Sequence, residues 1–281
     1  MSMLEKATKP KLKPPMITIV GSPGTGKTTL GALFPSPIIL PTEDGTAVFE
    51  NWEADAQPAV LPRLPKAVED AAGNITKSTR AALLALLDEL MQSQHDYKTL
   101  VIDSITTLDG LLGHEIALRD KVGTVADASG GFHKGFAEVA SWHAEFIYKC
   151  EQLRAVKGMG IVFLAHTGIK KIRNRPDAAA DYSVFSLDMD GQALSAYVAQ
   201  SDAVLYLRKD ELVLGSEQNR KGQTTKYGRI THTGDRKLVA SSDGQVGYIN
   251  AKNRYGMPSE IDVVHGENPI LQFIKFYKEG K

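Results

Sequence analysis

The chain has 281 residues, and its 33 Lys and Arg balance its 33 Asp and Glu to a formal net charge of zero. Because there is no global excess of cations, any contact with nucleic acid must come from local basic patches. A single cysteine, Cys150, excludes an internal disulfide framework and is typical of a reducing compartment, so we expect a cytoplasmic protein.

Residues 1–14 are rich in Lys and Pro and lack the apolar run of a signal peptide, so we predict a flexible basic tail there. The remainder, residues 15–281, is long enough for one large α/β domain. No stretch approaches the run of about 18 apolar residues that a membrane-spanning helix needs, so we expect no membrane partner.

A predicted strand and a predicted helix flank a glycine-rich loop. Residues 16–20, MITIV, are apolar and β-branched, and residues 28–34 can start a helix. Between them lies the phosphate-binding motif G-x-x-x-x-G-K-[ST], in the strand–loop–helix context that it needs. Its glycines let backbone N–H groups surround phosphate oxygens. The nucleotide-binding residues predicted from this motif are Gly21, Ser22, Pro23, Gly24, Thr25, Gly26, Lys27, Thr28 and Thr29.

Two side chains of this loop carry its predicted chemistry. Lys27 is expected to reach the β- and γ-phosphates of a nucleotide, and the Thr28 hydroxyl is expected to ligate Mg²⁺. The cofactors that the motif predicts are therefore ATP and Mg²⁺.

Strand and helix signals alternate along the first two-thirds of the chain. Strands are predicted at residues 37–40, 99–102 and 160–165, and helices from residue 78 or 79 to about 93, at 105–117 and at 134–157. Prolines interrupt residues 50–77, and residues 120–133, rich in Gly, Ala and Asp, are predicted to form a mobile loop. The alternation predicts an α/β fold with a mostly parallel sheet and helices on both faces.

The pattern changes after residue 200. Residues 203–249 carry short alternating segments, such as 203–207, 211–214 and 229–232, which are separated by turn signals such as TGD at 233–235. Such segments are typical of antiparallel strands and hairpins. We therefore predict that residues 203–281 add an antiparallel extension to the same sheet.

Acidic residues follow two of the predicted strands. An ATPase needs a carboxylate for the metal and a group that holds the attacking water. Asp103 ends the strand at 99–102 and is the candidate for Mg²⁺, with Ser104 beside it. Glu43 follows the strand next after the loop, and the ends of neighbouring parallel strands converge on a nucleotide. Glu43 is therefore the candidate for holding water, and Asp44 stays open as an alternative.

His166 follows the predicted strand at residues 160–165. A polar side chain at this position can contact the γ-phosphate and relay its presence to the next segment. A buried histidine that only satisfies backbone groups is an equally open interpretation.

Taken in order, GSPGTGKTT, IILPTEDG, TLVIDSITTL, GIVFLAHTGIK and AKNRYGMP resemble a RecA-type ATPase core over residues 15–265. The chain is similar to the small phage-type nucleotide-binding ATPases, whose members include ATP-dependent single-strand annealing proteins. The resemblance implies a RecA-like P-loop NTPase fold for residues 15–281. It also implies that Glu43 is the catalytic glutamate and that His166 is the γ-phosphate sensor.

The segment AKNRYGMP, residues 251–258, carries a further implication. It is similar to the segment by which RecA-like rings and filaments insert a Lys and an Arg into the neighbour's ATP site, and the matching residues are Lys252 and Arg254. A cation from a second subunit stabilises charge on the γ-phosphate and makes hydrolysis depend on assembly. The resemblance thus implies a homo-oligomer, with ring and filament both open. Without it, a basic turn facing solvent would be favoured.

A basic cluster comes directly after His166. It contains the predicted DNA-binding residues Lys170, Lys171, Arg173 and Arg175. Tyr182 and Phe185 lie nearby in the sequence, and cations with aromatic rings suit single-stranded DNA, because they hold its phosphates and stack on its bases. By resemblance, this segment corresponds to a loop that contacts DNA in RecA-like proteins.

Two further segments are candidates for DNA contact. Residues 120–133 occupy the place of the other DNA loop of RecA-like proteins. A second basic cluster is the weaker candidate, because charge runs are usually solvated faces. Its members are Arg220, Lys221, Lys226, Arg229, Arg236 and Lys237.

Together these features predict an ATPase that assembles on single-stranded DNA for recombination or strand annealing, in the host cytoplasm if it is phage-encoded. Candidate partners are single-stranded DNA, further copies of the chain and a single-strand binding protein. Two other functions stay open. A ring helicase or translocase would separate strands at the expense of ATP, and a regulatory ATPase acting on protein partners would show no salt-sensitive DNA affinity.

Overall fold

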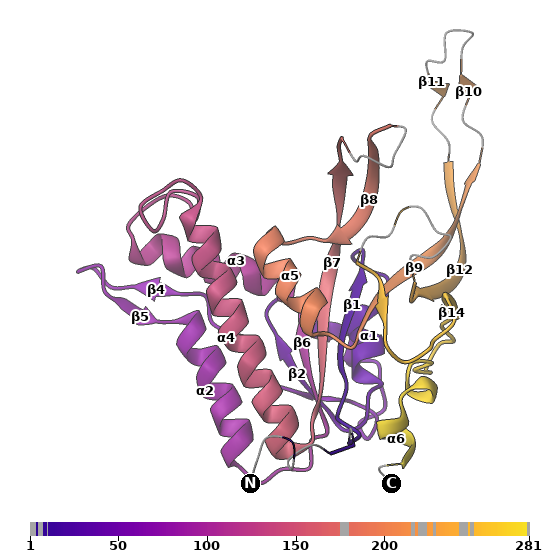
Figure 1. The fold of residues 1–281 in the computed structure, drawn as a ribbon, viewed down its shortest axis with the longest axis horizontal. Coiled ribbons are helices and arrows are strands. Elements are labelled where there is room, and N and C mark those ends of the chain that lie inside the picture. The colour runs from indigo at the N-terminus through magenta and orange to yellow at the C-terminus, as the bar shows by residue number, and fades with distance from the viewer. Residues whose placement is uncertain are drawn as a thin grey trace.

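The computed structural model describes residues 4, 8–9, 11–174, 180–214, 217–218, 224–226, 229–241, 247 and 250–279. A twisted sheet runs through the molecule, with a layer of long helices on one side of it (Figure 1). Hydrogen bonding orders the sheet as β14-β12-β9-β1-β7-β6-β2-β3. These strands are β1 (Met16–Gly21), β2 (Pro37–Pro41), β3 (Ala59–Val60), β6 (Thr99–Asp103), β7 (Gly160–Ile172), β9 (Ala203–Leu214), β12 (Arg229–Val239) and β14 (Glu260–Asp262).

From β9 across to β3, neighbouring strands are parallel. The other pairings are antiparallel: β12 with β9 and β14, β8 (Tyr182–Leu187) with β7, and β13 (Lys252–Asn253) with β9. The predicted α/β fold, with a mostly parallel sheet and a C-terminal antiparallel extension, is confirmed. Among the described residues, two short antiparallel strand pairs lie off this sheet: β4 (Val68–Glu69) with β5 (Ile75–Lys77), and β10 (Glu217–Gln218) with β11 (Thr224–Lys226).

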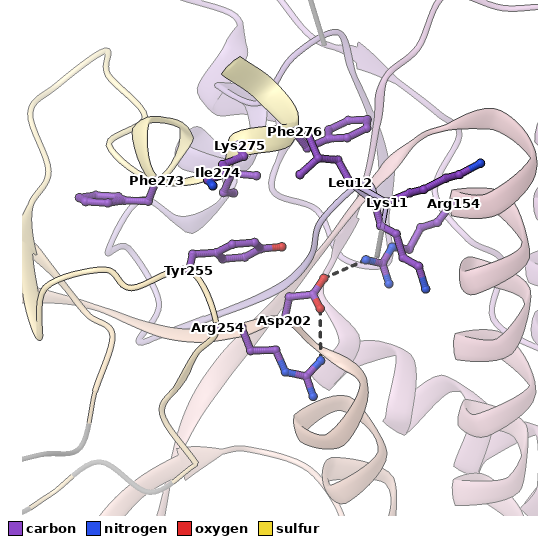
Figure 2. Close-up of a pocket in the computed structure, with 11 residues that line it drawn as sticks. Lys11, Leu12, Arg154, Asp202, Arg254, Tyr255, Phe273, Ile274, Lys275 and Phe276 are labelled. Carbon is purple, nitrogen blue, oxygen red and sulfur yellow. Dashed lines mark hydrogen bonds and ion pairs between the residues drawn. The ribbon is translucent and has the colours of Figure 1, made fainter. Parts of the chain in front are cut away.

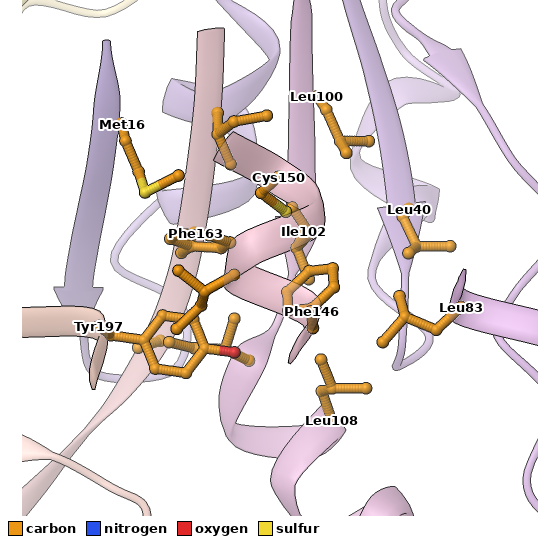
Figure 3. Close-up of a cluster of buried hydrophobic side chains, with 14 of the residues drawn as sticks. Met16, Leu40, Leu83, Leu100, Ile102, Leu108, Phe146, Cys150, Phe163 and Tyr197 are labelled. Carbon is orange, nitrogen blue, oxygen red and sulfur yellow. The ribbon is translucent and has the colours of Figure 1, made fainter. Parts of the chain in front are cut away.

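Successive side chains of a strand point to opposite faces, so the central strands feed two hydrophobic cores. Phe163 belongs to one core and the adjacent Val162 to the other. The larger core lies against α2 (Thr79–Gln92), α3 (Ile105–Arg119), α4 (Lys134–Lys157) and α5 (Gly191–Gln200). Figure 3 shows Phe146 and Tyr197 beside Phe163 there, with ring centroids 5.9 and 4.9 Å away. The opposite core takes in α1 (Lys27–Ala32), η2 (Leu271–Phe273) and α6 (Lys275–Glu279).

Capping residues explain where the long helices begin and end. At the start of α2, Ser78 Oγ accepts a 2.9 Å hydrogen bond from the Ala81 N–H, and Ser104 caps α3 in the same way. α4 ends at Lys157, and Gly158 after it has a φ of 67°, which suits a glycine cap. The predicted bounds of α2 and α4 therefore agree with the structure closely, whereas α3 runs on to Arg119.

Other predicted segments differ from the structure. Residues 50–77 are not wholly irregular, because they contain β3, β4 and β5, and η1 (Thr46–Phe49) precedes them. The predicted strands at 203–207 and 211–214 are one strand, β9. The predicted turn at 233–235 lies inside β12, where the pairing register with β9 shifts between His232 and Arg236 and Gly234 has φ of 91°. A bulge absorbs the extra residues there. Helix α5 has no counterpart among the predicted elements.

Strand β7 is longer than its predicted range, 160–165. It continues through His166 to Ile172, and residues 167–172 pair with β8. The parallel neighbours of β7 end at Gly21 and Asp103, so the backbone beyond needs another partner, which β8 supplies. The predicted loop after His166 is thus, in its described part, a β-hairpin that projects past the sheet (Figure 1).

The predicted tail is partly outside the described residues, namely at 1–3, 5–7 and 10. Pro14 is buried, and its carbonyl oxygen accepts a 2.8 Å hydrogen bond from Arg154 Nε, so the packed chain begins no later than Pro14. Residues 120–133 form turns without regular elements, and their mobility stays a prediction. Among the helices described, none is long and apolar enough to cross a lipid bilayer.

Candidate functional site

The carboxyl ends of β1, β7, β6 and β2 meet at one edge of the sheet. In the register of the strands, Gly21 lies beside His166, and Asp103 lies beside Pro41, two residues before Glu43. The phosphate-binding loop and the polar residues predicted after three strands are therefore brought together, as expected where parallel strands converge.

Glycines shape the loop at positions that other residues disfavour. Gly24 and Gly26 have φ of 73° and 97°, in the left-handed region where a Cβ is strained. A Cβ on Gly21 would lie 2.7 Å from the carbonyl oxygen of Leu207 on β9. Glycine lets this backbone fold tightly and keeps its N–H groups free of side-chain cover. A loop that binds phosphate groups through its backbone requires both.

Lys27 begins α1 and is only 6% exposed. Its Nζ donates hydrogen bonds to the carbonyl oxygens of Gly21, at 2.8 Å, and Ser22, at 3.2 Å. Burial lowers the pKa of Lys27, while the charges of Asp103 and Glu43 oppose that shift. The ammonium group therefore lies inside the loop, between its backbone and two carboxylates.

Asp103 is 5% exposed at the end of β6. Its Oδ2 accepts a 2.5 Å hydrogen bond from Thr28 Oγ1. Burial raises the pKa of Asp103, and the hydrogen bond from Thr28 opposes this. A hydroxyl and a carboxylate side by side are the hard oxygen ligands that Mg²⁺ prefers. The residues present thus fit both the metal and the phosphates that the motif implies.

Glu43 reaches the site from the segment after β2. Its Oε1 accepts a 3.0 Å hydrogen bond from His166 Nε2, and its Oε2 accepts one of 3.1 Å from Thr107 Oγ1. The hydrogen bond from His166 lowers the pKa of Glu43, which burial only partly opposes. Asp44 beside it is exposed. The geometry therefore favours Glu43 over Asp44 as the group that holds water.

Threonines that the sequence reasoning missed hold these groups in place. The Thr42 N–H donates to the Asp103 carbonyl oxygen, and Thr42 Oγ1 accepts from the Ser104 N–H, both at 2.7 Å. These bonds join the ends of β2 and β6. The sequence could have indicated Thr42, because this residue directly precedes Glu43.

His166 lies between the edge where the parallel strands end and the β7–β8 hairpin. Its N–H donates a 2.9 Å hydrogen bond to Thr106 Oγ1, so α3 fixes its backbone while Glu43 fixes its ring. The adjacent threonines Thr106 and Thr107 thus hold His166 and Glu43 respectively. The sequence could have indicated both threonines, because the pair TT in the segment SITTL follows Asp103 at the start of a predicted helix.

Residues 13–255 match the family model described as the AAA domain, a region that contains every residue of this site. The chain belongs to the AAA domain family. It therefore has an AAA-type P-loop ATPase domain, for which ATP is the expected ligand. No curated protein sequence matches the chain.

Lys252 and Arg254 of the AAA domain lie at the opposite end of the strands from the loop. Asp202 precedes β9, and its Oδ2 accepts a 3.0 Å hydrogen bond from the N–H of Met16, the first residue of β1. Arg254 Nη1 is 3.3 Å from Asp202 Oδ1. Lys252 Nζ donates to the carbonyl oxygens that end α5. The structure therefore does not bring these two cations to the phosphate loop of their own subunit.

Arg254 lines a cavity of about 400 Å³ that Figure 2 shows. Asp202 sits in its wall between Arg254 and Arg154, bonded to both, and Tyr255 and Phe273 add aromatic surface. The Arg254 side chain is 57% exposed. Its guanidinium group is thus accessible on the surface of the AAA domain.

Of the predicted DNA-binding residues, Lys170 and Lys171 lie in β7 of the AAA domain and Arg173 directly follows it. Lys170, Lys171 and Arg173 are exposed, and Arg175 lies outside the described residues. Cross-strand partners share a face of a hairpin, and faces alternate along each strand. Because Ile169 pairs with Phe185, these two residues share one face with Lys171, while Lys170 points to the other.

The face that carries Lys171 combines charge with apolar surface. Ile169 is 72% exposed and Phe185 40%. Near the tip, Lys171 and Arg173 line a hollow of about 400 Å³ with Tyr182 and the acidic Asp181. Cations and exposed rings therefore occur together in space as well as in the sequence.

Of the second basic cluster, Arg220 and Lys221 lie outside the described residues. Lys237 Nζ is 3.6 Å from Glu260 on β14. Arg236 lies at the phosphate loop, against Gly26. Arg236 and Lys237 therefore do not form one shared basic surface.

Proposed function

We propose that this AAA domain is a Mg²⁺-dependent ATPase that assembles on single-stranded DNA for recombination or strand annealing. One observation carries the proposal: β7 is a single strand that runs from His166, hydrogen-bonded to Glu43, to the exposed Lys170 and Lys171. A side chain of the candidate site and a cationic surface are thus parts of the same strand.

The chemistry assigns each group one role. Glu43, kept ionised by its hydrogen bond from His166, accepts a proton from the water that attacks the γ-phosphorus. Lys27 offsets negative charge on the phosphates. Thr28 and Asp103 would hold Mg²⁺, which would supply positive charge against the negative charge that develops in the transition state. The hydrogen bond from Thr107 keeps the Glu43 carboxylate oriented.

Coupling to DNA follows from what His166 touches. ATP and ADP differ at the γ-phosphate, and a ligand shifts a conformation only through contacts that differ between states. A γ-phosphate beside Glu43 competes for the His166 ring, which moves the start of the hairpin. The affinity of Lys171 and Arg173 for DNA phosphates then depends on the nucleotide.

Assembly supplies the remaining cations. The resemblance to RecA-like ATPases assigns Lys252 and Arg254 to a neighbour's ATP site, and the exposure of Arg254 away from its own loop supports that role. Two different surfaces, the catalytic edge of one copy and the Arg254 end of the next, then meet head to tail, which generates a ring or a filament. A single-strand binding protein is a further candidate partner on the same DNA.

The test is fluorescence anisotropy of a labelled single-stranded oligonucleotide with ATP, a slowly hydrolysed analogue, ADP and no nucleotide. We expect tighter binding with ATP and the analogue than with ADP or no nucleotide. His166→Ala should bind DNA with the same affinity in all four states, because the relay is removed. The matched control is His265→Ala, which removes an exposed histidine after β14 and should behave as wild type.

The outcomes separate the alternatives. Wild-type affinity that is identical in all four states contradicts the coupling. No salt-sensitive DNA affinity in any state contradicts the DNA role altogether and favours a regulatory ATPase that acts on proteins. ATP-driven separation of a duplex would favour a motor.

A further inference from the structure

Arg236 of β12 lies against the phosphate-binding loop of its own chain. A Cβ built on Gly26 would be 3.5 Å from Arg236 Cζ, 3.6 Å from Nε and 3.7 Å from Nη1. Arg236 follows the register shift that begins at His232 on β12. Bulges re-aim side chains, so this irregularity explains how a strand residue two strands away from β1 can point at the loop.

The guanidinium group of Arg236 lacks a partner among the described residues. Its Nε is buried without a hydrogen bond, and no ion pair to Arg236 is formed by those residues. By contrast, Lys237 and Arg208 nearby both contact Glu260, at 3.6 and 2.9 Å. A buried donor without an acceptor costs free energy, so a partly buried, unpaired cation at a phosphate cradle points to an anionic ligand.

The position of Arg236 also indicates which part of the ligand it would contact. The groups associated with the γ-phosphate and metal, Asp103, Glu43 and His166, lie on the β7, β6 and β2 side of β1. Arg236 lies on the β9 and β12 side, beyond Gly26. A nucleotide whose γ-phosphate faces Glu43 has its nucleoside end on the side of Arg236.

We propose that Arg236 binds the α- and β-phosphates of the nucleotide in its own subunit, as a second cation of the phosphate loop. This inference rests on the nucleotide binding in the proposed function and is independent of its DNA role. It replaces the DNA contact that the sequence predicted for Arg236. Because ADP and ATP share these phosphates, Arg236 is expected to set affinity for both and not to distinguish between them.

The experiment measures the Kd of ADP and of a slowly hydrolysed ATP analogue by isothermal titration calorimetry, with Mg²⁺ present. Arg236→Gln should weaken both about tenfold or more, since a hydrogen bond to a charged group contributes about 1.5–3 kcal/mol and 1.4 kcal/mol is tenfold. Its Kd values should also depend less steeply on salt, because one cation that pairs with phosphate is removed. Arg236→Lys should recover part of the affinity. Lys237→Ala, the adjacent cation that pairs with Glu260, should match wild type.

Each outcome decides the proposal. Unchanged ADP affinity in Arg236→Gln overturns it, and so does weakened binding with an unchanged salt dependence, which would mark a role in loop structure alone. A loss confined to the ATP analogue would place Arg236 at the γ-phosphate and also overturns it. Should Arg236→Gln fail to fold by circular dichroism, Arg236→Met, which also removes the charge and keeps an unbranched side chain, is measured by the same two criteria. If wild type binds nucleotide but not DNA, the proposed function fails while this inference stands. If wild type binds neither nucleotide, both fail.

Discussion

At the scale of single residues, the pKa values of two carboxyl groups of the site are shifted in opposite directions. The hydrogen bond from His166 holds the pKa of Glu43 below its ordinary value, whereas burial raises the pKa of Asp103. The first carboxylate is thereby kept ready to accept a proton. The second is held in an environment that disfavours its charge, which a bound Mg²⁺ would compensate.

This difference predicts that Asp103 opposes folding when no metal is bound. The folded state binds the Asp103 proton more tightly than the unfolded state, so the ionised form lowers stability as pH rises through the raised pKa. Asp103→Asn should therefore raise the Tm of the nucleotide-free protein near neutral pH by about 2–4 °C for each kcal/mol gained. The advantage should fade as pH falls below that pKa, where Asp103 is already neutral.

The measurement is differential scanning calorimetry across pH, with and without Mg²⁺ and an ATP analogue. Asp103→Asn should also lose the stabilisation that Mg²⁺ and nucleotide give to wild type. Glu89→Gln, at an exposed acid on α2, is the matched control and should show no pH-dependent gain. A Tm equal to or below that of wild type at neutral pH would contradict this account of Asp103.

At the scale of elements, the proposed function gives the hairpin formed by β7 and β8 two kinds of contact with DNA, ionic and stacking. Replacing Lys170, Lys171, Arg173 and Arg175 by Ala should weaken single-strand binding and leave ATP binding intact. Removing one cation that pairs with a DNA phosphate should flatten the log–log salt slope by about 0.7. Phe185→Leu should instead weaken binding with an unchanged slope, because a ring that stacks on a base releases no counterion.

Anisotropy titrations across salt check both effects. Lys77→Ala, which removes an exposed lysine from β5, should leave affinity and slope unchanged. If the four-fold variant binds as wild type does, the hairpin is not the DNA site. If Phe185→Leu changes only the slope, the assignment of stacking to that face is wrong.

The sequence predicted those elements that are determined by residues close together in the chain. The glycine motif placed the loop between β1 and α1, and the caps and apolar stripes placed α2 and α4. It could not predict that β7 runs on to Ile172, because the partner that satisfies this backbone, β8, is contributed by a later segment. Arg236 was missed as a neighbour of Gly26 for the same reason, since that proximity depends on strand order and on a bulge in β12.

At the scale of the whole molecule, the proposed function requires a second copy of the chain to complete the active site. Arg254→Ala and Lys27→Ala should each be inactive alone, since an arginine finger contributes about 10³–10⁵ in rate. Mixing them should restore part of the ATPase activity, because one interface of the mixed assembly pairs an intact loop with an intact Arg254. The measurement is the hydrolysis rate against mixing ratio, with co-assembly verified by light scattering. Absence of rescue at every ratio would count against a role for Arg254 in trans.

The central claim joins ATP hydrolysis to single-stranded DNA, and steady-state ATP turnover with and without an oligonucleotide tests it most directly. Wild type with Mg²⁺ should hydrolyse ATP faster as DNA is added, because DNA promotes the assembly that completes the site. Glu43→Gln should still bind ATP but lose about 10²–10⁴ in rate, the usual contribution of a general base. A wild-type rate that DNA leaves unchanged, or that equals the rate of Glu43→Gln, would contradict the account.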